Sequence, residues 1–232
     1  MTSTLAAGLA GAGAVLACAA GYLVRGMFLP TRGRLIASYP QPKKALLVLD
    51  IQESGQRPEI PFPAHTPLGR MISNVNLLVE AFNGSGHAVA YVRQVFRSSL
   101  ISRLHGGRIL AGRLEPRICR WVTVVNGNDF VKDRTDAFSN RQLERFLIEH
   151  QVNDLYLVGL DAAFCVYFTA RGALNRGYRV TVVSDAVMTG RDMNHVLERY
   201  RKRGISVVSS HELLDTFGSK AGRDDKICGE KI

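Results

Sequence analysis

Three side chains that together suit thiol-based hydrolysis each follow a strand-like run in this sequence: Asp50, Lys132 and Cys165. Cys165 lies where a strand-turn-helix passage should open a helix, and the positive end of a helix dipole favours a thiolate. A carboxylate can accept the thiol proton and later deliver it to a leaving amine, while an ammonium holds the thiolate and orients the carboxylate. The structural alternatives are a buried small side chain for Cys165, a turn or helix cap for Asp50, and a solvated strand end for Lys132.

Other residues that act as nucleophile partners or metal ligands are scattered. The six histidines are His65, His87, His105, His150, His195 and His211. They suggest no Cys-His pair at the ends of the strands that carry Asp50, Lys132 and Cys165, which argues against Cys-His chemistry of the papain kind. The four cysteines are too few and too dispersed for a disulfide framework or a CxxC zinc site, so free thiols in a reducing compartment are expected. A redox-sensing thiol is another alternative, but Cys165 has no resolving cysteine nearby in sequence.

The apolar pattern predicts the elements that would position these side chains. Strand-like runs occur at residues 45–49, 87–93, 129–132, 155–158, 178–183 and 205–208. Helical patterns alternate with them at residues 66–82, 139–150, 165–177, 192–203 and 210–217, and a short extra strand is considered at 121–125. Thr66 before Pro67, and a capping box that begins at Ser139, mark two helix starts.

This alternation predicts an α/β fold, namely a doubly wound six-stranded parallel sheet of order 3-2-1-4-5-6 with helices on both faces. In such a sheet the site lies beyond the carboxyl ends of the strands, where the strand order reverses. The first and fourth strands are neighbours at that point. Asp50 and Cys165 are therefore expected to approach each other.

An apolar stretch precedes the predicted domain. Residues 1–24 carry no charge, and residues 5–24 would extend about 30 Å as a helix, enough to cross a bilayer. Five basic residues and no acidic one lie between positions 25 and 49, so the positive-inside rule predicts an outward N-terminus and a cytoplasmic domain. The alternatives are a cleaved signal or lipoprotein sequence near Ala17–Ala19, disfavoured because no basic residue precedes the apolar core, and a buried or disordered segment.

The predicted organisation is therefore an apolar anchor helix with its flanks at residues 1–27, a linker at 28–42, the α/β domain at 43–217 and a loose polar tail at 218–232. The protein is expected to be a single-pass membrane protein whose domain faces the cytoplasm.

The net charge of +10 has two main sources, the flank of the apolar stretch and the segment 97–120. The arginines of that segment and just before it are Arg93, Arg97, Arg103, Arg108, Arg113, Arg117 and Arg120, opposed by one acid, Glu115. As a lid or rim the segment would attract an anionic substrate or acidic lipid, and the structural alternative is a solvated or subunit-contacting loop. The chain has no run of the KKRK type and no RNA-binding aromatic motif, so a membrane surface is favoured over nucleic acid as its binding partner.

Three blocks of this chain resemble a known family. They are LLVLDIQ at 46–52, FVKDRTDAF at 130–138 and VGLDAAFCVYFTARGALNRGYRVTVVSDA at 158–186. In order and spacing they are similar to the signature blocks of the isochorismatase-like cysteine hydrolases, a superfamily that includes nicotinamidases, N-carbamoyl amidohydrolases and isochorismatases. The resemblance covers residues 43–217.

The resemblance implies roles for several residues. Asp50 would be the general base and acid, Lys132 its electrostatic partner, and Cys165 the nucleophile that forms a thioester. A cis peptide is implied between Leu160 and Asp161, with the N–H groups of Asp161 and Cys165 as the oxyanion hole. Gln52, Phe138 and Phe164 are expected to line the pocket because they lie near the catalytic residues in sequence. Dimers or tetramers are common in the superfamily, so a homo-oligomer is expected.

Two departures from the family pattern matter. After the first strand this chain has ESGQRPEIPFPAH, which offers His65 but not the Asp-x-His metal motif of nicotinamidases, so we expect no metal and no cofactor. Asp161 replaces a commonly small or hydroxylated residue, and its charge is expected to raise the pKa of the thiol. The predicted function is a membrane-anchored, metal-independent cysteine hydrolase that cleaves a small amide or ureide. The alternative is a catalytically silent module of the same fold that binds a metabolite or partner at the membrane.

Overall fold

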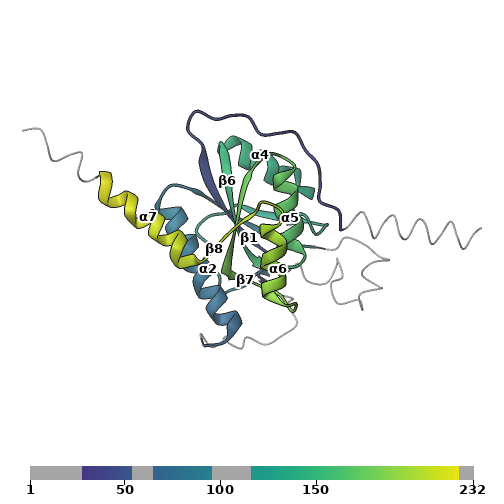
Figure 1. Ribbon diagram of the computed structural model, residues 1–232. Coiled ribbons are helices and arrows are strands. Elements are labelled where there is room, and N and C mark those ends of the chain that lie inside the picture. The colour runs from purple at the N-terminus through teal and green to yellow at the C-terminus, as the bar shows by residue number, and fades with distance from the viewer. Residues whose placement is uncertain (1–27, 54–64, 96–115, 225–232) are drawn as a thin grey trace, which may run out of the picture.

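The computed structural model describes residues 28–53, 65–95 and 116–224 (Figure 1). Six parallel strands form one sheet in the order β5-β3-β1-β6-β7-β8, which confirms the predicted order 3-2-1-4-5-6. The strands are β1 (Lys43–Leu49), β3 (Ala88–Gln94), β5 (Asp129–Lys132), β6 (Val152–Leu160), β7 (Arg179–Met188) and β8 (Ser206–Val208). A short antiparallel pair, β2 (Gln52–Glu53) and β4 (Arg117–Ile118), follows the carboxyl end of β1 along the chain.

β1 lies at the centre of the sheet because its side chains are apolar on both faces. Every residue from Ala45 to Leu49 is buried. Leu47 and Leu49 belong to the core on one face of the sheet, whereas Leu46 and Val48 belong to the core on the other. The carboxyl end of β1 is therefore fixed from both sides, between β3 and β6.

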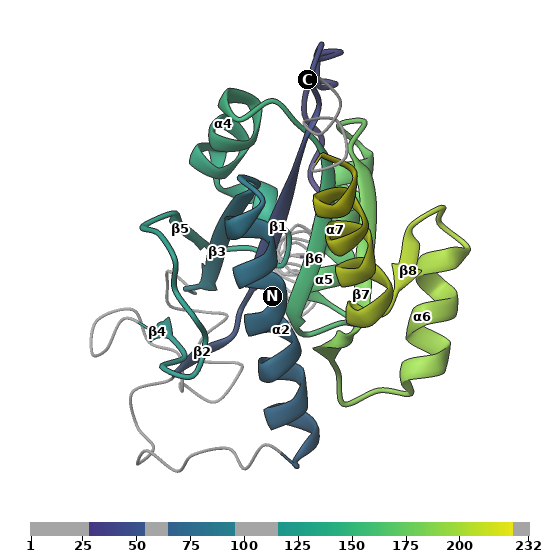
Figure 2. The ribbon, with the colours of Figure 1, turned by 90° about the vertical axis from the view of Figure 1, so that its left-hand side faces the viewer.

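Helices cover both faces of the sheet, as predicted (Figures 1 and 2). They are α2 (Pro67–Gly84), α4 (Arg141–Glu149), α5 (Cys165–Leu174), α6 (Met193–Arg201) and α7 (Ser210–Asp224), with a 3-10 turn η1 (Ala137–Ser139). The buried side chains of α2 and α7 join one core, and those of α4, α5 and α6 join the other. In Figure 2, α2 and α7 lie in front of the strands.

Local sequence sets where two of these helices begin. Thr66 caps α2 through its hydroxyl, and Pro67 takes the first helical position, as predicted. At α4 the cap is Asn140 and not Ser139, because the Asn140 side-chain oxygen accepts hydrogen bonds from two first-turn amides at 2.7 and 3.3 Å. Ser139 instead closes the turn η1, which is capped by Asp136.

Residues 121–125 do not form the short strand considered for them. The Thr123 amide donates to Asn76 Oδ1 at 2.8 Å, and the Val125 amide donates to the Tyr91 hydroxyl at 3.1 Å. Side chains of α2 and β3 therefore bind the backbone groups that a neighbouring strand would have bound.

The structure also differs from expectation toward the ends of the domain. α7 continues to Asp224, so helical backbone enters the segment expected to be a loose tail from residue 218. Residues 28–36, expected as part of a linker, lie against α5 and the turn that follows it, where the Ile36 amide donates to the Arg176 carbonyl at 2.9 Å. No helix within the described ranges is long and apolar enough to span a bilayer, and the predicted anchor at 1–27 lies outside those ranges.

Candidate active site

The acid, the ammonium and the thiol meet at the carboxyl edge of the sheet. Asp50 directly follows β1, Lys132 ends β5, and Cys165 opens α5 after β6. The Lys132 Nζ lies 2.8 Å from Asp50 Oδ2 and 3.3 Å from Cys165 Sγ. The structure thus brings together the three side chains that the sequence placed at strand ends.

The backbone is shaped closely around this cluster at two points. Asp50 has a φ of 54°, in the left-handed region that Asp tolerates better than most residues. Gly159 has a φ of 115° and pairs with Leu49, and a Cβ at this position would lie 2.0 Å from the Leu49 carbonyl oxygen. Glycine therefore permits β6 to approach β1 immediately before Asp50, and the separation of Asp50 from Cys165 depends on that approach.

Oxygen atoms surround the ammonium of Lys132. The side chain is fully buried, and Nζ donates to Gln94 Oε1 and to the carbonyls of Arg134 and Thr135, the latter two at 3.3 and 3.4 Å. Gln94 is fixed in turn by Gln52, whose amide group donates to the Gln94 carbonyl at 3.1 Å and accepts from the Gln94 amide at 2.8 Å. The lysine is therefore held in one position by groups that do not react.

The sequence alone did not single out Gln94. The available signal is its place at the end of β3, between β1 and β5 and hence between the strands that carry Asp50 and Lys132. Its side chain is only 5% exposed. A buried amide at a strand end between two site strands therefore indicates a supporting role.

The charges of the site follow from burial and from contact between its members. Burial acts to lower the pKa of Lys132, but attraction to Asp50 and Cys165 outweighs it and raises the pKa above its usual value. The pKa of the Cys165 thiol is raised from 9.0 to about 12, first by burial and then by the Asp50 carboxylate, while Lys132 acts to lower it. The resting site therefore holds a carboxylate, an ammonium and a neutral thiol.

Asp50 is placed to take the thiol proton. Its Oδ2 pairs with Lys132, whereas its Oδ1 is buried and has no hydrogen-bond partner among the described residues. The Asp50 carboxylate lies close enough to the Cys165 thiol to raise its pKa. Asp50 is therefore the candidate group for accepting the thiol proton.

The turn before Cys165 is built around Asp161. The peptide between Leu160 and Asp161 is cis, as the resemblance implied. The Asp161 carbonyl accepts from the amides of Phe164 and Val166 at 3.0 and 3.1 Å, and its carboxylate accepts from the Ala163 amide at 2.7 Å. The Asp161 side chain therefore shapes the turn. The rise in the thiol pKa comes first from burial and from Asp50, in contrast to the effect expected of Asp161.

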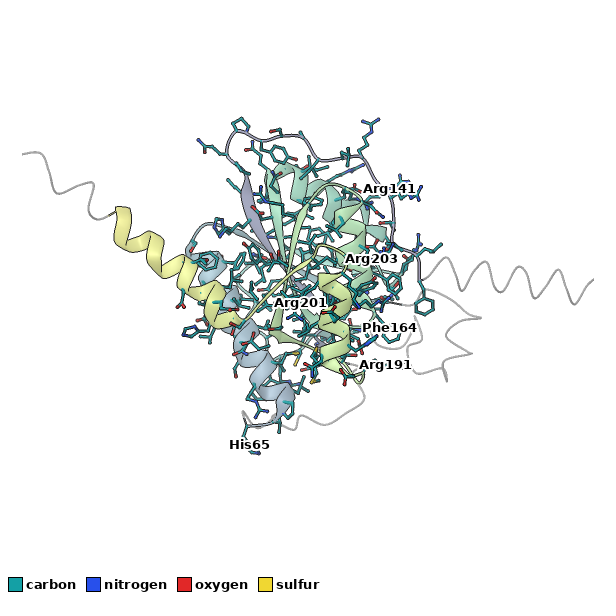
Figure 3. All side chains as sticks on the ribbon, in the orientation of Figure 1. His65, Arg141, Phe164, Arg191, Arg201 and Arg203 are labelled. Atoms are coloured by element: carbon teal, nitrogen blue, oxygen red, sulfur yellow. The ribbon has the colours of Figure 1, made fainter. Side chains whose placement is uncertain are left out.

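The three residues expected to line the pocket lie in different surroundings. Gln52 is bound to Gln94, as described above. Phe138 is 3% exposed and packs in the core against Tyr178, because the turn η1 directs it inward, so it does not line an accessible pocket. Phe164 is 36% exposed and precedes Cys165 directly, and its ring lies 5.9 Å from the Arg191 guanidinium (Figure 3). Of the three, Phe164 lies at the rim of the site.

The described ranges contain no group of three or more His, Cys, Asp or Glu side chains that could hold a metal ion, and His65 is exposed. Most of the arginine-rich segment lies outside those ranges. Two of its flanking arginines are paired with acids, since Arg93 lies 2.8 Å from Asp129 and Arg120 lies 3.2 Å from Glu53.

Comparison with known proteins agrees with this fold. The family model described as the isochorismatase domain matches residues 44–212, which is most of the chain. This match covers the region that contains the six-stranded parallel sheet and, at its switch point, the acid, the ammonium and the thiol. The chain belongs to the isochorismatase family.

Individual relatives are more distant. The chain is 34% identical over 89 residues to an uncharacterized isochorismatase family protein, PncA, of Bacillus subtilis, a match that covers 38% of this chain and 49% of that protein. It is 24% identical over 157 residues to an N-carbamoylsarcosine amidase of Arthrobacter, covering 62% of this chain and 59% of that protein. The chain therefore spans about half the length of the curated relatives it matches.

Among solved structures, the N-carbamoylsarcosine amidase of Thermoplasma acidophilum superposes with a TM-score of 0.61 at 27% identity. That match covers 72% of this chain and 96% of the other. The shared fold therefore includes nearly the whole of that structure.

Proposed function

We propose that this protein is a cysteine hydrolase that cleaves the C–N bond of a small amide or ureide through a thioester intermediate. The observation that carries the proposal is a single buried ammonium, Lys132, within 2.8 Å of the Asp50 carboxylate and 3.3 Å of the Cys165 sulfur. Two of the matched proteins are named N-carbamoylsarcosine amidases, which supports an amide or ureide substrate.

In the first half-reaction Cys165 Sγ attacks the substrate carbonyl carbon as its proton passes to Asp50. The tetrahedral oxyanion accepts hydrogen bonds from the N–H groups of Asp161 and Cys165, which are preorganised by the turn before α5. Collapse of this intermediate breaks the C–N bond, and the leaving nitrogen takes the proton from Asp50. The products of this half are an amine or ammonia and a thioester on Cys165.

In the second half-reaction a water molecule attacks the thioester carbonyl. Asp50 accepts a proton from the water, and the C–S bond breaks as that proton returns to sulfur. The acid product leaves and the thiol is restored. Throughout the cycle Lys132 stays protonated, so its role is to hold the carboxylate in place and to stabilise negative charge on sulfur.

The proposal is tested by ammonia release from a panel of small amides, ureides and N-carbamoyl compounds, with the full chain as enzyme. We expect turnover of at least one class, its loss in Cys165→Ala and Asp50→Asn, and an acyl group on the Cys165 peptide after acid quenching. Cys119→Ala is the matched control, since Cys119 is the other free cysteine of the described residues and is buried in the α2 core. Turnover that survives Cys165→Ala would refute the mechanism.

A catalytically silent binding module is the second candidate, and the raised pKa of the thiol, to about 12, favours it. The two candidates differ in the reactivity of Cys165 toward iodoacetamide at neutral pH. A hydrolase site in which Asp50 removes the thiol proton during attack predicts alkylation that slows in Asp50→Asn. Alkylation that is unchanged or faster in Asp50→Asn, together with no turnover on the panel, supports the silent module.

We also propose that residues 5–24 anchor the protein in a membrane, with the domain in the cytoplasm. The described chain starts at Phe28, whose ring lies 6.5 Å from that of Phe164 beside Cys165. Three residues, 25–27, can span roughly 11 Å at most, so an anchored site would open close to the bilayer. Alkaline carbonate extraction of membranes tests the anchor. Release of the full chain into the soluble fraction would count against it.

We propose in addition that the protein forms a homo-oligomer. Leu77, Trp121 and Val124 are large exposed apolar side chains, and two hydrogen bonds of Asn76 bring α2 and residues 121–123 together. Light scattering of the purified protein tests this assembly, and Leu77→Asp is expected to weaken it. A monomer at all concentrations would contradict the proposal.

A further inference from the structure

A buried carboxylate that the mechanism does not use lies beneath the chain segment before β1. Asp136 is fully buried, and its Oδ2 accepts from the Thr31 amide at 2.6 Å and from the Thr31 hydroxyl at 2.7 Å. Its Oδ1 accepts from the Phe138 amide at 2.9 Å. We call residues 28–36 the strap. In Figure 1 the strap is the dark segment that passes outside α5 before the chain enters β1.

The strap is fixed at the same point by a buried cation. Arg176 is 2% exposed and donates to the Thr31 hydroxyl at 3.0 Å, so this hydroxyl accepts from Arg176 and donates to Asp136. Arg176 also pairs with Glu144 of α4 at 2.7 Å. Gly33 lies directly on this pair, because a Cβ there would be 2.5 Å from Arg176 Nε. The strap is thus locked to α4, α5 and η1 by one hydroxyl between two buried charges.

The residues bound by the strap directly follow the residues that hold the catalytic ammonium. Asp136 comes after Arg134 and Thr135, whose carbonyls accept from Lys132 at 3.3 and 3.4 Å. The Arg134 guanidinium in addition donates to the carbonyl of Leu29 in the strap at 3.3 Å. A shift of the strap would therefore be passed to the turn that sets the position of Lys132.

The strap also reaches the residues on either side of the thiol. The ring of Phe28 lies 6.5 Å from Phe164, which precedes Cys165, and 6.2 Å from Phe168, which lies one turn further along α5. One short segment thus contacts the Lys132 turn and the start of α5. No other described segment before β1 makes such contacts.

We infer that the strap is a working part of the active site, in which Thr31 is a positioning residue that fixes the turn 133–136 and, through it, the ammonium of Lys132. The catalytic consequence rests on the proposed function, whereas the effect on Cys165 does not. Lys132 is the group that lowers the pKa of the thiol, and the thiolate is the form that reacts with alkylating agents. Displacement of the Lys132 ammonium therefore slows alkylation of Cys165.

The test compares Thr31→Val, which keeps the shape but removes the hydroxyl, with Thr31→Ser, which keeps the hydroxyl. The readout is the rate at which iodoacetamide modifies the Cys165 peptide at pH 8, followed by mass spectrometry at a temperature where each variant is folded by near-UV circular dichroism. We expect Thr31→Val to react about 3- to 10-fold more slowly, equivalent to a thiol pKa higher by about 0.5 to 1 unit. Thr31→Ser should react at the wild-type rate, and Lys132→Met should set the lower limit.

Two further variants separate the lock from general disturbance of the strap. Gly33→Ala, which forces the Arg176–Glu144 pair apart, should reproduce the slow reaction of Thr31→Val. Arg34→Ala, at an exposed position of the same segment, should react like the wild type. Equal or faster alkylation of Thr31→Val, or equal slowing of Thr31→Val and Thr31→Ser, overturns the inference. Because no substrate is needed, these outcomes do not depend on whether the protein proves to be a hydrolase.

If turnover is found, the same variants give a second readout. Misplacement of a catalytic group by the order of 1 Å can cost up to about 100-fold in rate, so Thr31→Val should lower kcat about tenfold and leave KM nearly unchanged. A fall in folded fraction alone would lower the apparent kcat in proportion to the near-UV signal. A kcat loss that tracks that signal overturns the positioning role.

Discussion

The resting protonation state of the site can be measured through the stability of the protein. In the folded chain the pKa of Cys165 is about 12, against 9.0 for an ordinary thiol. A group with a raised folded-state pKa stabilises the fold fully below its unfolded pKa, and that stability is lost as the pH rises toward the folded value. Above pH 9 the free energy of unfolding of the wild type should therefore fall because of this thiol, and the same contribution should be absent in Cys165→Ala.

The size of this term follows from the two pKa values. At pH 10.5 the unfolded thiol is ionised and the folded thiol is not. Ionisation therefore lowers the free energy of unfolding by about 2 kcal/mol, at about 1.36 kcal/mol per pH unit above 9. At pH 8 the term is absent because the thiol is neutral in both states. Other groups titrate in this range, but they are common to both proteins and cancel in the difference.

The assay is urea unfolding of wild type and Cys165→Ala at pH 8, 9.5 and 10.5. The free energy of unfolding of the wild type, minus that of Cys165→Ala, should fall by about 2 kcal/mol between pH 8 and pH 10.5. A resting thiolate paired with Lys132 predicts a different course, in which the difference rises up to pH 9 and is flat above it. A difference that does not fall above pH 9 refutes the neutral resting thiol and, with it, the need for Asp50 as the base.

Three further substitutions probe the supports of the site. Lys132→Met should lower turnover by about 100-fold or more and destabilise the fold at neutral pH by about 3 kcal/mol, because it leaves the Asp50 carboxylate unpaired. Urea unfolding of Lys132→Met and of the wild type at pH 7 measures this destabilisation. Gln94→Leu should lower kcat about tenfold in steady-state kinetics and destabilise the fold by about 1–3 kcal/mol, since it removes one ligand of the buried Lys132 ammonium. Gly159→Ala should destabilise the fold by about 3 kcal/mol or more, whereas Gly84→Ala, which has nothing within 4 Å of its added Cβ, should be nearly neutral in the same unfolding assay.

The sheet and the reacting side chains could be predicted because their signals are local. An unbroken apolar run such as 45–49 predicts a strand buried on both faces, and the order of such runs with intervening helices predicts the topology. Topology then determines which strand ends are neighbours. For this reason Asp50 and Cys165 could be predicted to lie close together, whereas Lys132 could only be placed at the same edge of the sheet and was paired with Asp50 through the family resemblance.

The supports of the site could not be predicted, since they depend on contacts between residues far apart in sequence. Thr31 and Asp136 are separated by 105 positions, and Thr31 and Arg176 by 145. The strap is rich in the residue types of linkers, and its composition carries no sign of the two buried charges that bind it. Phe138 illustrates the same limit, because nearness to Lys132 in sequence suggested a pocket residue, and the turn η1 directs it into the core.

The arrangement of charge explains why so many groups hold the Lys132 ammonium in place. A half-buried thiol with a pKa of about 12 is a poor nucleophile until a base removes its proton, and the base must itself be ionised inside the protein. An ammonium 2.8 Å from Asp50 offsets the cost of burying that carboxylate, and the resulting pair has no net charge. The thiol proton can then move to Asp50 while negative charge moves to sulfur, 3.3 Å from the same ammonium. Because Lys132 must serve both positions of that charge, a small displacement of its Nζ weakens both states. Apart from Asp50 and Cys165, its ligands are a fixed amide and backbone carbonyls, which cannot titrate and do not compete for the proton.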